Sequence, residues 1–292
     1  MAAKDERVRD FLATRRAKVT PEMVGLPPGT RARRVPGLRR EEVAMLADVS
    51  VDYYTRIEKG DLTGVSDEIL EAISRSLRLT EDERVYLYDL ARTARRPSRV
   101  PRQSRRITGV PAQVQLLLDS MAGVPVLAHN GALDVLASNS LGRALFDIVY
   151  SSPTRATAST HPNLAAFVFL DPAAREFYTD FEDAAMMCVR TLRAQAGATP
   201  HDSRIIGLVG ELSTRSDDFS IRWASHDVGS HRTGTKKLHH RDVGELSLGF
   251  EQITLTSAPS ITLSTYIAEP GSATAERLQL LSSWTSTLIP TK

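Results

Sequence analysis

The chain has 292 residues, of which 41% are hydrophobic and 25% charged, and its 37 Lys and Arg nearly balance its 35 Asp and Glu. This composition is ordinary for a globular protein, and the length suits two domains that each have a core of their own. The sequence has no apolar run of membrane-spanning length and no signal-peptide pattern, so we expect neither a membrane protein nor a secreted one. Cys188 is the only cysteine, which excludes an intrachain disulfide and favours a reducing cytoplasm.

The near-neutral net charge of the whole chain hides a difference in charge between its two halves. Residues 1–110 contain 23 Lys and Arg against 17 Asp and Glu, whereas the remaining residues contain 14 against 18. A basic N-terminal half followed by an acidic C-terminal half suggests two tasks, one of which is the binding of a polyanion.

Three helices are predicted in the N-terminal half in addition to a central motif, one before this motif and two after it. The first, over residues 7–16, has an apolar stripe, and the second begins after Ser66, a favourable N-cap residue. The third begins at the capping box Thr80–Glu83. The apolar faces are Val8, Phe11 and Leu12; then Leu70, Ile73 and Leu77; then Leu87, Leu90, Ala91 and Ala94. With the central motif this makes five helices, enough for an all-helical domain.

The central motif, residues 35–60, has the pattern of two short helices joined by a tight turn. Ser50 is a favourable N-cap for the second helix, and Asp48 tolerates the left-handed backbone that such a turn requires. Such a pair can place its second helix in the major groove of DNA. The alternative is an ordinary helical hairpin with a solvated charged face. The apolar positions are Val43, Leu46 and Ala47 in the first helix, and Tyr54 and Ile57 in the second.

The second helix of this motif presents residues that can read bases. If Tyr54 and Ile57 are buried, the opposite face carries Val51, Asp52, Thr55, Arg56 and Lys59. An arginine can pair with guanine, a valine can touch a thymine methyl group, and an aspartate can accept a hydrogen bond from a cytosine amino group. At the start of the first helix, Arg39 and Arg40 are predicted to contact phosphates.

Two further basic segments lie on either side of the helical region. Residues 25–37 are rich in Gly and Pro and are predicted to form a loop, in which Arg31, Arg33 and Arg34 are either phosphate contacts or merely solvated charges. Residues 95–111 contain three Pro and six Arg, which predicts an extended linker that is a charged tether or an additional DNA contact.

The second half mixes helical and strand patterns. A short helix from Ala112 to Met121 is followed by two strands, residues 124–129 and 133–137, around the turn residues Asn130-Gly131, and a helix begins at Asn139-Ser140. Further helices are predicted over residues 162–198 in pieces, 200–215 and 216–225. One helix face joins Phe177, Phe181, Ala184, Cys188 and Leu192. Cys188 is therefore predicted to pack as a small hydrophobic residue rather than to act as a nucleophile.

From Thr233 to Ala268 the apolar period becomes two, which predicts strands. The apolar positions change parity along this segment, and a bulge near Glu251-Gln252 would reconcile them. A turn is predicted at residues 258–260. The two faces hold Leu246, Leu248 and Phe250, then Ile253 and Leu255, and after the turn Ile261, Leu263 and Ile267. A closing helix begins at Ala273, with Leu278, Leu281 and Leu288 on its apolar face and Trp284 nearby. Helices with an antiparallel sheet predict an α+β domain.

Residues that could perform catalysis or bind a metal are sparse. Four histidines lie close together, but their spacing matches no strong zinc pattern: His226, His231, His239 and His240. The sequence has no phosphate-binding loop, nucleophile elbow or paired carboxylates. We therefore predict no catalytic residue, no metal and no enzyme. Residues 223–229, WASHDVG, put an aromatic ring, an imidazole and a carboxylate between helix and sheet, where they form either a pocket wall or ordinary core.

Several segments closely resemble the MmyB-like transcription regulators of bacteria, especially actinobacteria. In the first half these are GLPPG, GLRREEVAMLA, VSVDYYTRIEKG and ERVYLYDLAR; in the second they are NLAAFVFLDPAAREFY, LRAQAG, LVGELSTRS, WASHDVG, HHRDVGELSLGFE and LSTYIAEPGS. The family joins a repressor-type, Xre-like helix-turn-helix domain to a PAS-like ligand-binding domain. The resemblance thus implies a five-helix DNA-binding domain over residues 1–94, a basic linker over 95–111, and an α+β PAS-like domain with an antiparallel sheet over 112–292.

The resemblance also implies roles for single residues. Val51, Asp52 and Arg56 match base-reading positions, and Arg40 and Lys59 match phosphate-holding positions. In phage-repressor-like domains an arginine at the place of Arg16 pairs with a glutamate at the place of Glu58. The ligand-binding residues expected are Asn139, Trp223 and His226, with Arg193 as a carboxylate partner.

We therefore expect a cytoplasmic, sequence-specific regulator that binds double-stranded DNA as a homodimer. Its effector would be a small apolar molecule, such as a fatty acid, with no other cofactor and no membrane. The alternative is a ligand-sensing module whose helical domain binds a protein partner rather than DNA.

Overall fold

The computed structural model describes residues 5–27, 37–95, 109–155, 157, 159–225 and 233–287, with side chains up to residue 284. These residues fall into two compact units. The first is formed by the described residues up to 95 with 196–201 and 224–225, and the second by the remaining described residues. Each unit is described by itself below. No helix among the described residues is long and apolar enough to cross a membrane.

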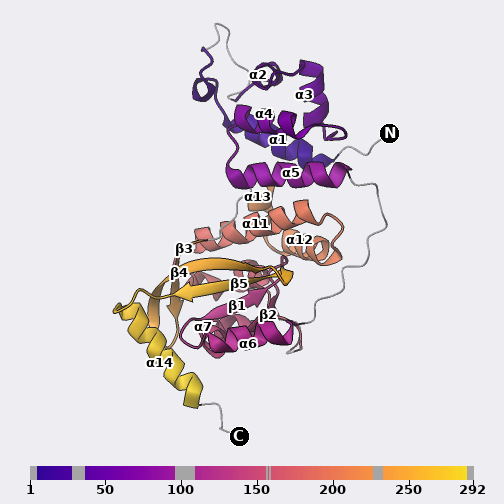
Figure 1. Ribbon diagram of the computed structural model, residues 1–292. Coiled ribbons are helices and arrows are strands. Elements are labelled where there is room, and N and C mark those ends of the chain that lie inside the picture. Colours follow the sequence, from indigo (N-terminus) through magenta and orange to yellow (C-terminus); the bar gives the residue numbers. More distant parts are fainter. Residues whose placement is uncertain are drawn as a thin grey trace. The chain divides into compact units, whose positions relative to one another are not determined.

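The first unit contains the five α-helices that the sequence predicts. These are α1 (Glu6–Lys18), α2 (Arg40–Leu46), α3 (Val51–Glu58), α4 (Asp67–Ser76) and α5 (Glu81–Arg95), with a short 3-10 helix, η1 (Glu22–Val24), after α1 (Figure 1). The predicted start signals are confirmed. Ser66 Oγ accepts a hydrogen bond from the Ile69 N–H, and Thr80 and Glu83 form the reciprocal capping box.

Helices α2 and α3 form the predicted helix-turn-helix. Asp48 lies in the turn with φ of 54°, the left-handed conformation that a short polar side chain tolerates. Ser50 Oγ accepts a hydrogen bond of 3.1 Å from the Tyr53 N–H and so begins α3. Tyr54 and Ile57 are fully buried, which fixes the face of α3 that points outward.

The core of this unit is made by the apolar faces of all five helices, with Phe11 of α1 packed edge-on against Tyr86 of α5 at 5.1 Å. One expected core residue differs. Ala94 is exposed, and the buried face of α5 begins earlier, at Tyr86 and Leu87. The last turn of α5 thus continues past the core, because helix propensity and capping extend a helix further than its apolar stripe.

The second unit is built on one antiparallel sheet of five described strands. The strands are β1 (Val126–His129), β2 (Val135–Ser138), β3 (Thr233–His240), β4 (Gly244–Leu255) and β5 (Ala258–Ile267), in the spatial order β2-β1-β5-β4-β3. The helices are α6 (Ala112–Ser120), α7 (Ser140–Leu145), α8 (Asp147–Tyr150), α9 (Leu164–Leu170), α10 (Ala174–Phe177), α11 (Phe181–Ala198), α12 (Ser203–Arg215), α13 (Asp217–Ala224) and α14 (Ala273–Thr287). The expected α+β class and antiparallel sheet are confirmed.

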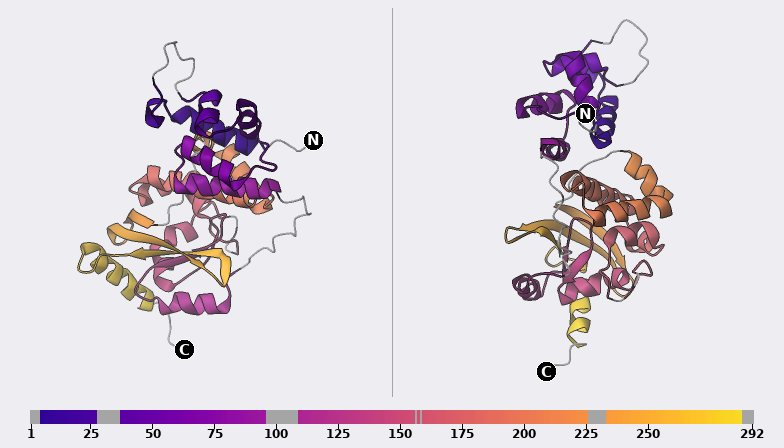
Figure 2. Two further views of the ribbon diagram at one scale, coloured as in Figure 1. Left: turned by 45° about the horizontal axis from the view of Figure 1, so that its top comes forward. Right: turned by 90° about the vertical axis from the view of Figure 1, so that its right-hand side faces the viewer.

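Helices cover both faces of this sheet, as the two views of Figure 2 show. On one face, Val114 and Leu118 of α6 pack against Ala128 of β1 and Leu263 of β5. On the other, the Tyr266 ring lies 4.9 Å from the ring of Phe146, which follows α7. Successive side chains of β1 and β5 therefore pack alternately into two cores, one on each face of the sheet. This explains why the middle of β5 is buried on both sides.

The sheet corrects three predictions. Pairing of β4 with β5 is regular through Thr254, so there is no bulge at Glu251-Gln252; the irregularity lies at Thr254/Leu255, beside the turn. That turn is at residues 256–257 rather than 258–260, so Ala258 is already in β5. Ile253 and Ile267 are 41% and 49% exposed instead of filling a core. The partner strand and not the local apolar pattern sets this register.

Two predicted helical segments are also divided differently. Phe177 ends α10, whereas Phe181 begins α11, because Tyr178 is extended and pairs with β3. The predicted single helix face through Phe177 and Phe181 is therefore wrong. The predicted helix over residues 200–215 begins at Ser203 behind the N-cap Asp202, and Ser216 separates it from α13. Leu278 and Leu281 of α14 are buried as predicted, Trp284 is 47% exposed, and Leu288 lies outside the described residues.

Candidate nucleic-acid interface and ligand cavities

The outward face of α3 is open to solvent in its own unit. Val51 is 46% exposed, and Asp52, Arg56 and Lys59 are exposed as well, while Thr55 is half-buried. These are the residues that the buried positions Tyr54 and Ile57 force outward. The face thus offers one apolar contact, one carboxylate and two cations along a single helix.

Arg56 is held by its neighbours within this face. Its guanidinium carbon lies 4.8 Å from the centre of the Tyr53 ring, and its Nε lies 3.8 Å from Oδ2 of Asp61. The side chain remains 48% exposed. It is therefore partly ordered while it can still reach a ligand.

Glu58, at the end of α3, is a buried carboxylate shared by two arginines. Arg16 Nε donates to it at 2.7 Å, which confirms the predicted pair, and Arg40 Nε donates at 2.8 Å. Burial acts to raise the pKa of Glu58, but the hydrogen bonds and charges of Arg16 and Arg40 outweigh it and hold the pKa below its usual value. This cluster ties α3 to α1 and α2 and fixes the angle at which α3 is presented.

The other predicted phosphate contacts differ in their surroundings. Arg40 is 49% exposed although it is paired with Glu58, so its outer edge remains accessible. Arg39 precedes α2, where its backbone N–H donates to the Glu42 carboxylate and its exposed side chain lies 3.4 Å from Glu41. The loop residues Arg31, Arg33 and Arg34 and most of the linker, residues 96–108, lie outside the described residues.

Of the four predicted ligand residues, Asn139 has its hydrogen bonds taken up by the fold. Its amide nitrogen donates to the carbonyls of Met121 and Val124 at 2.8 and 2.7 Å. Its oxygen accepts from the N–H groups of Val126 and Gly142 at 3.1 and 2.7 Å. With both donors and both acceptor positions used and 2% exposure, Asn139 caps α7 and joins it to β1.

Arg193 and Trp223 are brought together. The Arg193 guanidinium lies 4.2 Å from the Trp223 ring centre and donates a hydrogen bond to the Trp223 carbonyl oxygen. Trp223 in turn stacks on Phe219 at 5.4 Å, and Arg193 is only 4% exposed. The arginine thus joins α11 to α13. His226, the fourth predicted ligand residue, lies outside the described residues.

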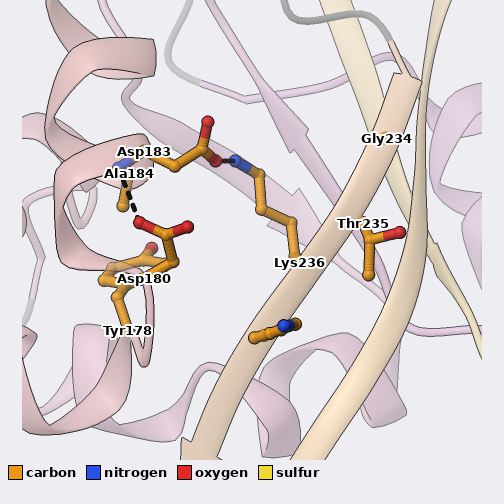
Figure 3. A pocket seen from close by; sticks show the side chains of 8 residues that line it. Tyr178, Asp180, Asp183, Ala184, Gly234, Thr235 and Lys236 are labelled. Atoms are coloured by element: carbon orange, nitrogen blue, oxygen red, sulfur yellow. Dashed lines mark hydrogen bonds and ion pairs between the residues drawn. The ribbon is translucent and has the colours of Figure 1, made fainter.

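The second unit contains a polar cavity of about 250 Å³ that sequence reasoning missed (Figure 3). Lys236 of β3 lines it and donates a hydrogen bond of 2.6 Å from Nζ to Oδ2 of Asp183 of α11, and Tyr178, Asp180 and Thr235 line it as well. The Lys236 side chain is 5% exposed. One signal could have found it, because Lys236 occupies the inward parity of β3 together with Leu238 and His240.

A second cavity, of about 220 Å³, is more apolar. It lies between α14, α7 and the end of β5 and is lined by Val124, Leu141, Ile267, Ala268 and Leu278, among others. Asn139, Arg193 and Trp223, the predicted ligand residues that the structure describes, line neither of these two cavities.

Of the other residues considered for chemistry, Cys188 and His240 are accounted for by packing, and His231 lies outside the described residues. Cys188 is 1% exposed, and burial raises the pKa of its thiol to about 12, as a packed small hydrophobic residue requires. His239 is exposed, and His240 is buried with Nε2 donating to the Ala144 carbonyl at 3.2 Å. Within the part of the chain that the structure describes, no three His, Cys, Asp or Glu residues gather as metal ligands.

Comparison with known families identifies both units. A family model described as "MmyB-like transcription regulator ligand binding domain" matches residues 110–281, more than half of the chain. A model described as "Helix-turn-helix domain" matches residues 8–87. The chain matches none of the curated proteins with which it was compared.

Proposed function

The chain belongs to the family of MmyB-like transcription regulators, and we propose that α3 reads a specific operator sequence under the control of a small molecule bound in the second unit. A helix-turn-helix domain joined to this ligand-binding domain makes the protein a DNA-binding transcription regulator. The operator, the ligand and the oligomeric state are the proposed part.

The observation that carries the proposal is the open face of α3. The helix lies second in the helix-turn-helix, it is anchored through Tyr54, Ile57 and Glu58, and it presents Arg56 and Lys59 outward. A helix of this kind enters the major groove with its exposed residues at the base edges.

The chemistry of the exposed residues supports a division of labour. Arg56 would donate to guanine, Val51 would contact a thymine methyl group, and Asp52 would accept from cytosine. Thr55, half-buried on the same face, can hydrogen-bond to a base or a phosphate. Lys59 and the outward edges of Arg39 and Arg40 would hold phosphates, which fix position without reading sequence.

The protein would act as a homodimer on two half-sites. One α3 contacts only a few base pairs, so a pair of helices about one DNA turn apart on a repeated sequence would supply the specificity of an operator. Such a regulator would work in the cytoplasm, and we assign it no catalytic activity.

The effector would be a small apolar molecule, such as a fatty acid. The apolar cavity beside α14 supports this proposal, because apolar linings favour ligands of that kind. Binding would change DNA affinity only to the extent that the ligand prefers one of two conformations of the dimer.

A shift assay with the full-length protein tests the DNA-binding proposal. Duplexes enriched from a random pool would be measured at two salt concentrations. Arg56→Ala should cost about 1–3 kcal/mol on the enriched sequence and relax base preference at one position. Arg40→Ala should weaken all sequences alike and flatten the salt dependence.

Arg92→Ala is the matched control, since Arg92 is 67% exposed on α5. This substitution should change neither the base preference nor the salt dependence of binding. If the pool yields no preferred sequence and binding is equal for all duplexes, DNA reading is refuted and a protein partner for the helical unit becomes the better explanation.

The effector is tested separately, with saturated fatty acids of increasing chain length. A bound acid should raise the melting temperature of the protein in a concentration-dependent way and change its affinity for the enriched duplex. Unchanged melting at every chain length would exclude this ligand class and leave the DNA-binding proposal intact.

A further inference from the structure

The end of α3 brings a carboxylate to the side of Arg56. Gly60 has φ of 97°, its N–H donates to the Ile57 carbonyl at 2.9 Å, and the Asp61 N–H donates to the Arg56 carbonyl at 3.2 Å. These two bonds and the left-handed glycine constitute a Schellman motif, which turns the chain back along the helix. Residue 61 is therefore folded against residue 56, five positions earlier.

The carboxylate of Asp61 is itself held in place. Its Oδ1 accepts a hydrogen bond of 3.1 Å from the Thr63 N–H, which leaves Oδ2 directed at Arg56. The 3.8 Å between Oδ2 and Arg56 Nε is too long for a hydrogen bond but is an ion pair. Asp61 is 26% exposed, so water screens this attraction only in part.

Tyr53 holds the other side of the guanidinium. It precedes Arg56 by three residues and therefore lies on the same helix face, and the guanidinium carbon is 4.8 Å from the ring centre. Tyr53 is half-buried against the core of the unit, which restricts the ring. The long arginine side chain is thus confined between a ring and a carboxylate.

We propose that Tyr53 and Asp61 are positioning residues that orient Arg56 to read a guanine. The inference rests on the proposed operator reading by α3 and adds the residues that orient the Arg56 side chain for it. Asp61 approaches Arg56 at Nε, and no hydrogen bond from a described residue engages the two terminal nitrogens. Two such donors match the O6 and N7 acceptors of guanine in the major groove.

The proposal makes Asp61 act in two opposite directions. Its negative charge repels phosphates, so Asp61→Asn should strengthen binding to unrelated DNA by roughly two- to fivefold at low salt. The same substitution removes the electrostatic guide for Arg56 and should reduce discrimination for guanine at one operator position by about tenfold. Substitution of a merely structural residue would not raise the affinity for unrelated DNA while lowering the discrimination for guanine.

The experiment uses the full-length protein and duplexes in which each operator position is replaced in turn. Tyr53→Leu should lose discrimination at the same position as Arg56→Ala, and Tyr53→Phe, which keeps the ring, should retain it. Glu68→Gln on α4 is the charge-matched control, since it also removes one carboxylate charge from this unit, at an exposed position. It should leave base discrimination unchanged.

The outcomes separate this inference from the function on which it rests. Loss of discrimination in Arg56→Ala, but neither in Asp61→Asn nor in Tyr53→Leu, would overturn the positioning roles alone. A preferred base other than guanine at the Arg56 position would overturn the predicted readout. If Arg56→Ala itself discriminates as the parent does, Arg56 is not a base reader and this inference fails, whereas a preferred sequence in the parent still supports operator reading by the protein. Melting curves of each variant must match the parent, and if Tyr53→Leu unfolds, Asp61→Asn and Tyr53→Phe still decide.

Discussion

Each unit of the protein holds a buried carboxylate that several hydrogen-bond donors keep ionised. The two carboxylates differ in where along the sequence their donors lie. Glu58 is bonded to Arg16 and Arg40, all three on the helices of the first unit. Asp134 in the second unit is bonded to Arg204, Asn163 and Asn130, which come from α12, the start of α9 and the adjacent turn. Both have pKa values below the usual range, although burial acts to raise them.

The comparison shows which kind of network a sequence reveals. Glu58 and its arginines lie in a motif of fixed spacing, so the pair with Arg16 could be predicted. Asp134 and Arg204 are 70 residues apart, and nothing near either of them indicates the other. Glu58 orients α3, the proposed DNA-reading helix, whereas Asp134 joins the β-hairpin to two helices of the second unit.

Removing the charge of Glu58 should have the largest effect. Glu58→Gln leaves Arg16, only 15% exposed, without its anion and should lower the free energy of unfolding by about 3 kcal/mol. Because both tryptophans lie in the second half, urea unfolding should show an earlier loss of circular dichroism that tryptophan fluorescence does not follow. Simultaneous earlier transitions by both probes would mean that the two units unfold together.

Asp134→Asn should cost less, about 2 kcal/mol, because Arg204 is 44% exposed and can turn toward water. The amide can still accept from Asn163 or Asn130, so part of the network survives. Here the tryptophan fluorescence should move to lower urea. Arg215→Ala on the same helix, a surface pair with Glu211, is the control and should shift the midpoint little.

Acid should weaken both networks, in a direction fixed by their pKa values. A carboxylate whose pKa is lowered on folding stabilises the native state above its unfolded pKa, about 4, and this contribution is lost as the pH falls through the folded pKa. The parent should therefore lose stability below about pH 4. Glu58→Gln and Asp134→Asn should each lose less between pH 5 and pH 3; slopes equal to the parent's would contradict the ionised pairs.

The smallest effect concerns the turn between α2 and α3. Asp48 has φ of 54°, which Gly adopts without strain and a β-branched residue does not. Asp48→Gly should raise the free energy of unfolding by about 0.5 kcal/mol, and Asp48→Val should lower it by more than about 1 kcal/mol. Thermal melting of the two variants measures the predicted increase and the predicted decrease in stability. Stabilisation by valine would show that the turn has a different backbone conformation in that variant.

The parts of the fold that sequence predicts are those with local causes. Ser50, Ser66 and the Thr80–Glu83 box begin helices through hydrogen bonds within three residues, so α3, α4 and α5 were placed correctly. Burial of Tyr54 and Ile57 follows from helical period, and the outward face of α3 follows from their burial.

What could not be predicted depends on partners far along the chain. The register of β4 on β5 places the turn at residues 256–257 rather than at the predicted residues. Pairing with β3 separates Phe177 and Phe181 into two helices, so the predicted common helix face does not form. Asn139 begins α7 as the sequence predicts, but its role in ligand binding stays a prediction, since its four hydrogen bonds belong to the fold. Lys236 was missed because a lysine is usually assigned to the surface, and only the inward parity of β3 indicates otherwise.

Each outer strand of the sheet, β2 and β3, is paired at one point with a short segment of the same unit. On β3, Leu238 is bridged to Tyr178, and the Thr179 N–H donates to the Lys237 carbonyl at 3.2 Å. On β2, Asp134 is bridged to Asn163, and the Val135 N–H donates to the Pro162 carbonyl at 2.8 Å. An incoming strand from another molecule would have to displace these segments before it could extend the sheet. Strand addition at either edge of the sheet is therefore disfavoured at these two points, and the proposed dimer is expected to form through side-chain surfaces rather than by joining the two sheets.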